Sequence, residues 1–219
     1  MTRVKLIIFD LDGTLVNAYT PVFRSLNYVL KQCGLKTVGH AAVKRSVGWG
    51  DRNLLGRFIP PARIETALKS FREHHRKALK SGVRFMPGAK RLLNALKKEG
   101  CRLAVASNRS TGPSRVILRY LGIDKYFDYI LCGDKLKKLK PHPEVLLRIL
   151  KRFSVKPGEA VYVGDMTIDV AAGRRAKVRT AAVVTGSSAR KDIERLRPWR
   201  VISRVDDLLK DLLKEIKFR

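Results

Sequence analysis

The chain has 219 residues, of which 45% are hydrophobic, so it is long enough to bury a full core in one domain with a large insertion or in two smaller domains. Its 47 Lys and Arg residues against 19 Asp and Glu residues give a formal net charge of +28, which leaves a polyanionic partner, an anionic substrate or a solubilising surface open. The short apolar runs, the absence of a signal-peptide pattern and the three scattered cysteines predict a cytoplasmic protein without a membrane span, a disulfide framework or a zinc site.

The first predicted element is a buried strand, VKLIIFD at residues 4–10, which ends in Asp10 with Asp12 two positions further on. The next segment, residues 17–86, has helical patterns throughout, with the glycine-containing loop SVGWGDRNLLG between them. We therefore expect a helical insertion directly after the first strand's loop. It either enlarges the core or forms a second small domain over the crevice at the strand ends.

After residue 86, short β-rich runs alternate with helical patterns. Strands are predicted at residues 101–107, 129–133, 160–165 and 179–186, and helices at residues 87–100, 142–153 and from 205 to the C-terminus. Apolar strands that alternate with helices are typical of a parallel sheet covered on both faces. The predicted fold class is therefore α/β, with a doubly wound, Rossmann-like parallel sheet and an α-helical insertion.

Polar residues gather near the predicted carboxyl ends of the strands: Asp10, Asp12, Ser107, Asn108, Lys140, Asp165 and Asp169. A carboxylate such as Asp10 can attack an electrophilic phosphorus and form an aspartyl phosphate. Phosphoryl transfer needs its negative charge offset, and Mg²⁺ suits one or two carboxylates plus substrate phosphate, with Asp165 as the second ligand and Asp169 returning to the same side. Ser107 and Lys140 can hold phosphate oxygens, which leaves Asp12 to protonate the leaving oxygen and later activate water.

Each of these residues also has a plain structural interpretation. Asp10 and Asp12 can end a strand in a turn at Gly13, and the Ser107–Asn108 pair can cap a helix, a role that is compatible with binding phosphate. The two later aspartates can interact with the macrodipole of the following helix. The occurrence of all of these residues on one alternating pattern favours catalysis.

Four motifs carry a resemblance to a known family: FDLDGTL, ASN, KPHPE and GDMTID, in this order along the chain. With them the sequence resembles the haloacid dehalogenase superfamily, and within it the phosphoglycolate phosphatase-like branch. The resemblance covers essentially the whole chain. Members that act on carbon–halogen bonds lack the second aspartate of the first motif, so Asp12 favours phosphoryl chemistry. One departure is Asn17, where relatives often have an aspartate.

The resemblance implies a role for each motif residue. Asp10 becomes the nucleophile and Asp12 the general acid and base, and the phosphate-binding residues are Ser107, Asn108 and Lys140. The implied Mg²⁺ ligands are Asp10, the backbone carbonyl of Asp12 and Asp165, with Asp169 supporting or completing the metal site. Residues 17–86 become a mobile helical cap, and residues 1–16 and 87–219 the catalytic core. Trp49 and Arg52 are candidates for reaching the substrate from the cap, although a loop with one packed aromatic is an equal interpretation.

The predicted function is therefore a Mg²⁺-dependent phosphatase for a small phosphorylated metabolite, such as phosphoglycolate, a sugar phosphate or a nucleotide. Alternatives on the same scaffold are a phosphosugar mutase and a pyrophosphatase. The net charge of +28 motivates a further alternative, a nucleic-acid-associated phosphatase or binding protein. Because the basic residues are spread along the chain without a separate basic arm, we favour a small substrate over nucleic acid. The expected state is a monomer or a homodimer without a membrane partner.

Overall fold

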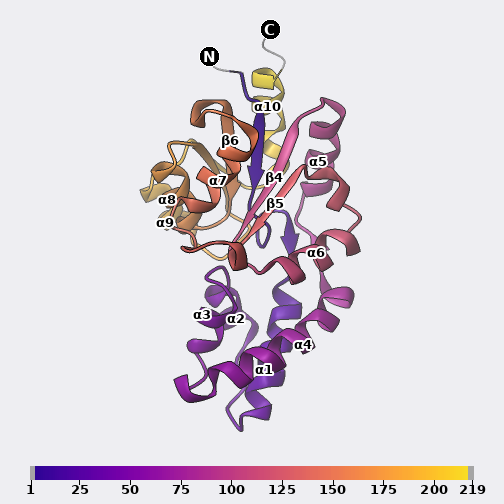
Figure 1. Ribbon diagram of the computed structural model, residues 1–219, viewed down its shortest axis with the longest axis vertical. Coiled ribbons are helices and arrows are strands. Elements are labelled where there is room, and N and C mark those ends of the chain that lie inside the picture. Colours follow the sequence, from indigo (N-terminus) through magenta and orange to yellow (C-terminus); the bar gives the residue numbers. More distant parts are fainter. Residues whose placement is uncertain (1–2, 217–219) are drawn as a thin grey trace.

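The computed structural model describes residues 3–216 of the chain, and its centre is a six-stranded parallel sheet (Figure 1). The strands lie in the order β5-β4-β1-β6-β7-β8. Their bounds are β1 Leu6–Phe9, β4 Arg102–Ser107, β5 Tyr129–Cys132, β6 Ala160–Gly164, β7 Arg179–Val183 and β8 Arg200–Ile202. The predicted α/β fold with a doubly wound parallel sheet is confirmed. Only β8 of this sheet lies outside the predicted strands.

Helices cover both faces of the sheet, because the side chains of its strands are buried on both sides. Ile7 and Phe9 of β1 belong to the core under α5 (Ala89–Lys98), whereas Leu6 and Ile8 belong to the core under α7 (Glu144–Phe153). This alternation is why the strand reads as one continuous apolar run. Figure 1 shows the other helices around the sheet, which are α6 Thr111–Tyr120, α8 Thr167–Arg175, α9 Arg190–Arg195 and α10 Leu209–Ile216.

The predicted C-terminal helix begins with the 3₁₀ helix η5 (Val205–Leu208) and continues as α10. Its last predicted residues, 217–219, lie outside the described part of the chain, as do residues 1–2 at the start of the predicted core. Short 3₁₀ helices also occur at η1 Pro61–Arg63, η2 Asp124–Tyr126, η3 Gly133–Lys135 and η4 Pro157–Glu159.

The helical insertion forms a separate group of helices beyond one end of the sheet, in the lower half of Figure 1. It consists of α1 Tyr19–Gln32, α2 His40–Ser46, α3 Asp51–Gly56 and α4 Ile64–Gly82. Its apolar core includes Leu26 and Leu30 of α1 and Leu68 and Phe71 of α4. Two short antiparallel strands, β2 (Val16–Asn17) and β3 (Arg84–Phe85), pair where the chain leaves and re-enters the sheet domain. That this segment acts as a cap stays a prediction.

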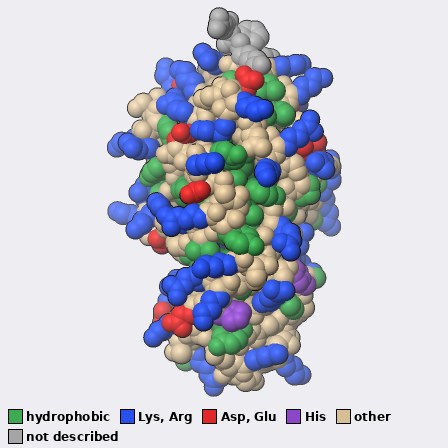
Figure 2. Space-filling view, turned by 90° about the vertical axis from the view of Figure 1, so that its right-hand side faces the viewer, with side chains coloured by type: hydrophobic (Ala, Val, Ile, Leu, Met, Phe, Trp, Pro, Cys, Tyr) green, Lys and Arg blue, Asp and Glu red, His purple; other side chains and the backbone are tan. Residues whose placement is uncertain are grey.

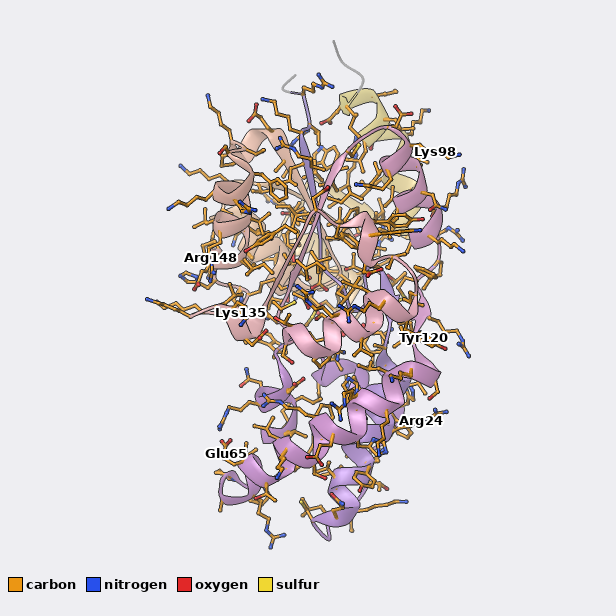
Figure 3. All side chains as sticks on the ribbon, turned by 45° about the vertical axis from the view of Figure 1, so that its right-hand side comes forward. Arg24, Glu65, Lys98, Tyr120, Lys135 and Arg148 are labelled. Carbon is orange, nitrogen blue, oxygen red and sulfur yellow. The ribbon has the colours of Figure 1, made fainter. Side chains whose placement is uncertain are left out.

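Lys and Arg side chains are spread over both parts of the molecule on the face shown in Figure 2, with few acidic side chains between them. In Figure 3 the exposed side chains of Arg24, Lys98, Lys135 and Arg148 project from α1, α5, η3 and α7 into solvent. On the face shown in Figure 2, the basic side chains are spread over the surface and are not gathered in one patch. None of the helices in residues 3–216 combines the length and the apolar composition needed to cross a membrane.

Candidate active site

The carboxyl ends of three neighbouring strands bring the predicted site residues together. Asp10 follows β1, Ser107 ends β4 and Asp165 follows β6. Because β1 lies between β4 and β6, and Phe9 pairs with residues of both, these three side chains meet at one edge of the sheet. Lys140 reaches the same place from the loop before α7.

Lys140 is one of two buried cations of this site. Its Nζ atom lies 2.6 Å from Asp10 Oδ1 and 2.7 Å from Asp169 Oδ1, and it donates to Tyr162 Oη at 3.0 Å. The side chain is only 3% exposed. Although burial alone would lower the pKa of Lys140, the Asp10 and Asp169 carboxylates raise it above its ordinary value. The ammonium is therefore charged at every pH at which the protein is expected to work.

Asp169 supports Lys140 and the loop after β6. Its Oδ1 atom accepts hydrogen bonds from Lys140 Nζ and from the hydroxyl of Tyr162, at 2.7 Å each. Its Oδ2 atom accepts the backbone N–H groups of Asp165 at 3.2 Å and Met166 at 2.9 Å. Because both oxygens already accept two hydrogen bonds, Asp169 is better placed to support the metal site than to coordinate directly, and a ligand role for it stays a prediction.

Asp165 is fully buried and held by two donors. Thr14 Oγ1 donates to its Oδ1 atom at 3.1 Å, and the backbone N–H of Ser187 donates to Oδ2 at 3.0 Å. The chain comes so close that a Cβ atom at Gly186 would lie 1.5 Å from Asp165 Oδ2, and one at Gly13 would lie 2.5 Å from it. Gly13 also has a φ of +84°, which L side chains rarely adopt. Glycine is thus required at position 13 of FDLDGTL for two reasons, the positive φ and the closeness of Asp165 Oδ2.

The buried carboxylates fit a divalent metal ion. Asp10, Asp165 and Asp169 each present an oxygen within 4.8 Å of the others, and carboxylate oxygens are ligands that Mg²⁺ prefers. Among the described residues, Asp10 Oδ2 accepts no hydrogen bond and is available for coordination or attack. Burial, together with the Asp169 charge, raises the pKa of Asp10 to about 7 against the opposing effect of Lys140. Burial and the charge of Asp10 raise that of Asp165 as well. The single ammonium group of Lys140 therefore does not neutralise the charge of the three carboxylates, whereas an additional divalent cation would.

Arg109, which the sequence analysis did not single out, holds Asp12. Its Nε atom donates to Asp12 Oδ2 at 2.7 Å and its Nη2 atom to Oδ1 at 2.9 Å, a bidentate ion pair. Its Nη1 atom lies 2.7 Å from Nε2 of His75 on α4, so one arginine joins the catalytic candidate to the helical insertion. The backbone N–H of Arg109 donates to Ser107 Oγ at 3.1 Å. The only signal in the sequence was its position directly after the ASN motif.

Asn108 joins the loops around the site through its side chain. Its Oδ1 atom accepts the backbone N–H of Lys140 at 2.9 Å, and its Nδ2 atom donates to the Lys140 carbonyl at 3.2 Å and the Gly48 carbonyl at 3.0 Å. The side-chain amide is therefore used for positioning Lys140 and the loop between α2 and α3. Phosphate binding at Asn108 stays a prediction, and it would rest on the backbone rather than on this amide.

A small cavity connects the site with the helical insertion. The volume open to the centre of a water molecule is about 40 Å³. The side formed by the sheet domain is lined by Asp10, Asp12, Ser107 and Lys140. The helical insertion lines the opposite side, mostly with apolar side chains: Val22, Val47, Leu54 and Phe71. In this arrangement the site has room for a small molecule only.

Trp49 and Arg52 lie away from this cavity. They line a separate one of about 560 Å³, between α3 and the start of α4, where Arg52 pairs with Glu65. Their neighbours Gly50 and Asp51 line the catalytic cavity instead. Neither Trp49 nor Arg52 is among the residues that line the catalytic cavity, and a role for them in reaching the substrate stays a prediction. The sequence could not show which residues of this loop face inward.

His75 provides a test of the contact between the insertion and the sheet domain. Burial and the neighbouring Arg109 lower the pKa of His75 from 6.5 to about 2, so the unfolded chain takes up this proton first as the pH falls. The stability that neutral His75 contributes is complete above pH 6.5 and is lost below it, by up to about 1.4 kcal/mol per pH unit. The free energy of unfolding of His75→Gln, measured by urea denaturation between pH 4.5 and 7.5, is therefore expected to fall less steeply with acid than that of the wild type.

The exposed His40 supplies the control for this experiment. His40→Gln is expected to follow the wild-type pH profile. Equal slopes for wild type, His75→Gln and His40→Gln would show that His75 is not buried in its neutral form.

Comparisons with known proteins point to one family. The family model described as haloacid dehalogenase-like hydrolase matches residues 7–183. The chain is 34% identical to the phosphoglycolate phosphatase of Aquifex aeolicus, over 84% of this chain and 86% of the relative. It is also 34% identical to that of Rhodospirillum rubrum, over 84% and 81%. The crystal structure of a protein from Haemophilus somnus, described as a predicted phosphoglycolate phosphatase, superimposes with a TM-score of 0.91 at 30% identity, covering 96% of this chain and 99% of that one.

Proposed function

The chain belongs to the haloacid dehalogenase-like hydrolases, and from this premise we propose that it is a Mg²⁺-dependent phosphatase that works through an aspartyl phosphate on Asp10. Its phosphoglycolate phosphatase relatives make it a phosphatase for a small phosphorylated substrate. The observation that supports the mechanism best is the position of Asp10, 2.6 Å from Lys140 at the floor of the cavity, with Oδ2 free of hydrogen bonds from the described residues. The predicted phosphoglycolate, sugar phosphate or nucleotide all belong to this substrate class.

The proposed reaction has two steps. Asp10 Oδ2 attacks phosphorus while the ester oxygen leaves with a proton from Asp12, which gives the alcohol and the aspartyl phosphate. Asp12, now a carboxylate, takes a proton from a water molecule that attacks this phosphate. The second step releases inorganic phosphate and returns Asp10, so the net reaction consumes one water molecule. Lys140 and Ser107 would hold the phosphate oxygens during both steps.

The residues that would hold Mg²⁺ are Asp10, Asp165 and the backbone carbonyl of Asp12, with Asp169 behind them. When bound, the ion would offset the repulsion between the phosphate dianion and the carboxylates of this site. Asp10 and Asp165 are 155 positions apart in the chain, but they follow the neighbouring strands β1 and β6. Only the folded sheet therefore brings these two ligands together.

Residues 17–86 would act as the cap of this site, with residues 1–16 and 87–219 as the catalytic core. Two hydrogen bonds across the cavity support this role, from Asn108 to the Gly48 carbonyl and between Arg109 and His75. A closed cap excludes water other than the attacking molecule and rejects bulky esters. The small volume of the cavity agrees with such a closed arrangement.

Phosphate release from a panel of esters tests this function. The panel contains 2-phosphoglycolate, a hexose 6-phosphate, a nucleoside monophosphate and pyrophosphate, each measured with Mg²⁺ and with EDTA. We expect release that requires Mg²⁺ and is fastest with one of the small esters. A separate incubation with a hexose 1-phosphate tests the mutase alternative, because conversion to the 6-phosphate without phosphate release would make the chain a mutase. If none of the esters reacts in either condition, the proposed function is wrong.

A further inference from the structure

A second cavity lies in the helical insertion, outside the catalytic site. It has a volume of about 560 Å³ between α3 and the start of α4, and cavities of about 300–1,000 Å³ commonly hold small molecules. Among the described residues, none that lines this cavity also lines the catalytic one. The proposed phosphatase function therefore leaves the second cavity without a role.

Trp49 lines this cavity with an aromatic ring that has no partner of its own. The side chain is half-buried, and within residues 3–216 its ring stacks on no other ring and its Nε1 atom makes no hydrogen bond. Because no buried side-chain nitrogen or oxygen in this part of the chain lacks a partner, Nε1 is open to solvent. Trp49 thus offers a ligand both an apolar surface and an unused donor.

The backbone around Trp49 is shaped by two glycines and held by the sheet domain. Gly48 and Gly50 have φ values of +108° and +86°, which L side chains rarely adopt. The Gly48 carbonyl accepts a hydrogen bond from Asn108, and a Cβ atom at Gly48 would overlap Met166 Sδ. The loop is therefore fixed on its catalytic side while Trp49 faces the second cavity, so little conformational freedom is lost when a ligand binds there.

Two arginines give the second cavity a positive charge. Arg57 makes no ion pair and no side-chain hydrogen bond with the described residues, so its five N–H groups are available. Arg52 pairs with Glu65, but these side chains are 64% and 74% exposed, and such an exposed pair contributes little to stability. No Asp or Glu is among the described residues that line the cavity. A phosphate can therefore replace Glu65 on Arg52 and bind Arg57 as well.

The rest of the lining suits a flat ring with polar edges. Ile59 and Ile64 are 3% and 6% exposed and give the cavity an apolar floor. Asn53 donates through Nδ2 to the Trp49 carbonyl at 2.7 Å, and its Oδ1 atom accepts no hydrogen bond from the described residues. This oxygen can accept an N–H at the edge of the ring. The cavity thus combines a surface for a ring with separate donors for an anion.

We propose that this cavity binds a nucleoside phosphate, with the base on Trp49 and the phosphate on Arg57 and Arg52. Stacking on an aromatic side chain and charge-assisted hydrogen bonds from guanidinium groups are interactions that suit the two halves of such a ligand. The net charge of +28 attracts this anion to the protein. The site is separate from the catalytic cavity, and its occupation does not depend on the proposed phosphatase function.

Tryptophan fluorescence in EDTA tests the site, with AMP as the probe. EDTA removes the metal that phosphate release is proposed to need, so AMP stays intact. Trp199→Phe leaves Trp49 as the single tryptophan, and stacking of the adenine ring should quench its emission. We expect AMP to bind about 10-fold more tightly than adenosine, which lacks the phosphate, and than ribose 5-phosphate, which lacks the base and is measured by competition. Equal Kd values for AMP and either fragment would overturn the proposal.

Variants show where AMP binds. In the Trp199→Phe background, Arg57→Gln keeps the fluorescent reporter and is expected to weaken AMP binding by about 10-fold. Arg24→Gln is the matched control and should leave the Kd unchanged, because this exposed residue of α1 does not line the cavity and lies on another side of the insertion from Glu65 (Figure 3). By calorimetry, Trp49→Leu should weaken AMP binding by about 10-fold, and Trp49→Phe should keep part of the affinity.

The other outcomes would overturn the proposal. An unchanged Kd in Arg57→Gln and Trp49→Leu would show that AMP binds elsewhere, for example in the catalytic cavity. Equal weakening in Arg57→Gln and Arg24→Gln would show a response to the overall charge rather than to this cavity. Neither quenching nor heat at millimolar AMP would show that the cavity does not bind nucleoside phosphates. Urea denaturation of each variant verifies that a loss of binding is not a loss of folding.

Discussion

Asp10→Asn is expected to lower kcat for phosphate release by about four orders of magnitude or more, as the loss of a nucleophile does in other enzymes. Asn has nearly the shape of Asp and can keep a hydrogen bond from Lys140 through its carbonyl oxygen. Its amide cannot attack phosphorus and leave again as a carboxylate, so no aspartyl phosphate forms. The measurement is single-turnover and steady-state phosphate release with 2-phosphoglycolate and Mg²⁺.

The stability of Asp10→Asn shows whether this loss is chemical. The pKa of Asp10 is raised from 3.8 to about 7. Between these two pH values the folded protein holds a proton on Asp10 that the unfolded chain has lost. The contribution of Asp10 to the free energy of unfolding therefore falls as the pH rises through this range. At pH 8 in EDTA, Asp10→Asn is therefore expected to be at least as stable as the wild type. Asp124→Asn, a change at an exposed acid of η2, should keep full activity. More than about one per cent residual activity in Asp10→Asn would argue against Asp10 as nucleophile.

Lys140→Met is expected to lower the free energy of unfolding in EDTA at pH 8 by about 3–5 kcal/mol, the range for a buried ion pair that loses one partner. The Lys140 Nζ atom lies 2.6 Å from Asp10 and 2.7 Å from Asp169, so its removal takes from these two buried carboxyl groups the ion pairs that offset their burial. The effect should shrink below pH 7, where Asp10 is protonated. Urea denaturation at pH 8 and pH 5.5 measures both values, and Mg²⁺ should restore part of the loss.

Two further variants control the Lys140 experiment. Lys138→Met changes an exposed lysine of the same loop and is expected to shift the stability by no more than about 0.5 kcal/mol. Combining Lys140→Met with Asp169→Asn removes one of the two stranded carboxylates and should recover part of the loss. If Lys140→Met and Lys138→Met have the same stability, the ion pairs around Lys140 do not hold this site together.

Several contacts of the site were beyond the reach of the sequence. Tyr162 lies inside a strand and looks like an ordinary core residue, yet its hydroxyl joins Lys140 to Asp169. Arg109 is one arginine among many, and its partners Asp12 and His75 lie far from it in the chain. The sequence also had no pattern that shows which side of the loop around Trp49 faces inward. Strand β8 has only three residues, too few for a recognisable pattern.

The sequence by itself determined the parallel sheet and the end of it at which the chemistry lies. Apolar runs that alternate with helical periods specify parallel strands, and parallel strands share one carboxyl edge, so residues that directly follow them, such as Asp10 and Asp165, must come together. Only the tertiary structure decided which side chains pair across this edge. Local periodicity records whether a residue faces a core, but the pairing of Arg109 with Asp12 and of Lys140 with Asp169 depends on the packing of segments that are distant in the chain.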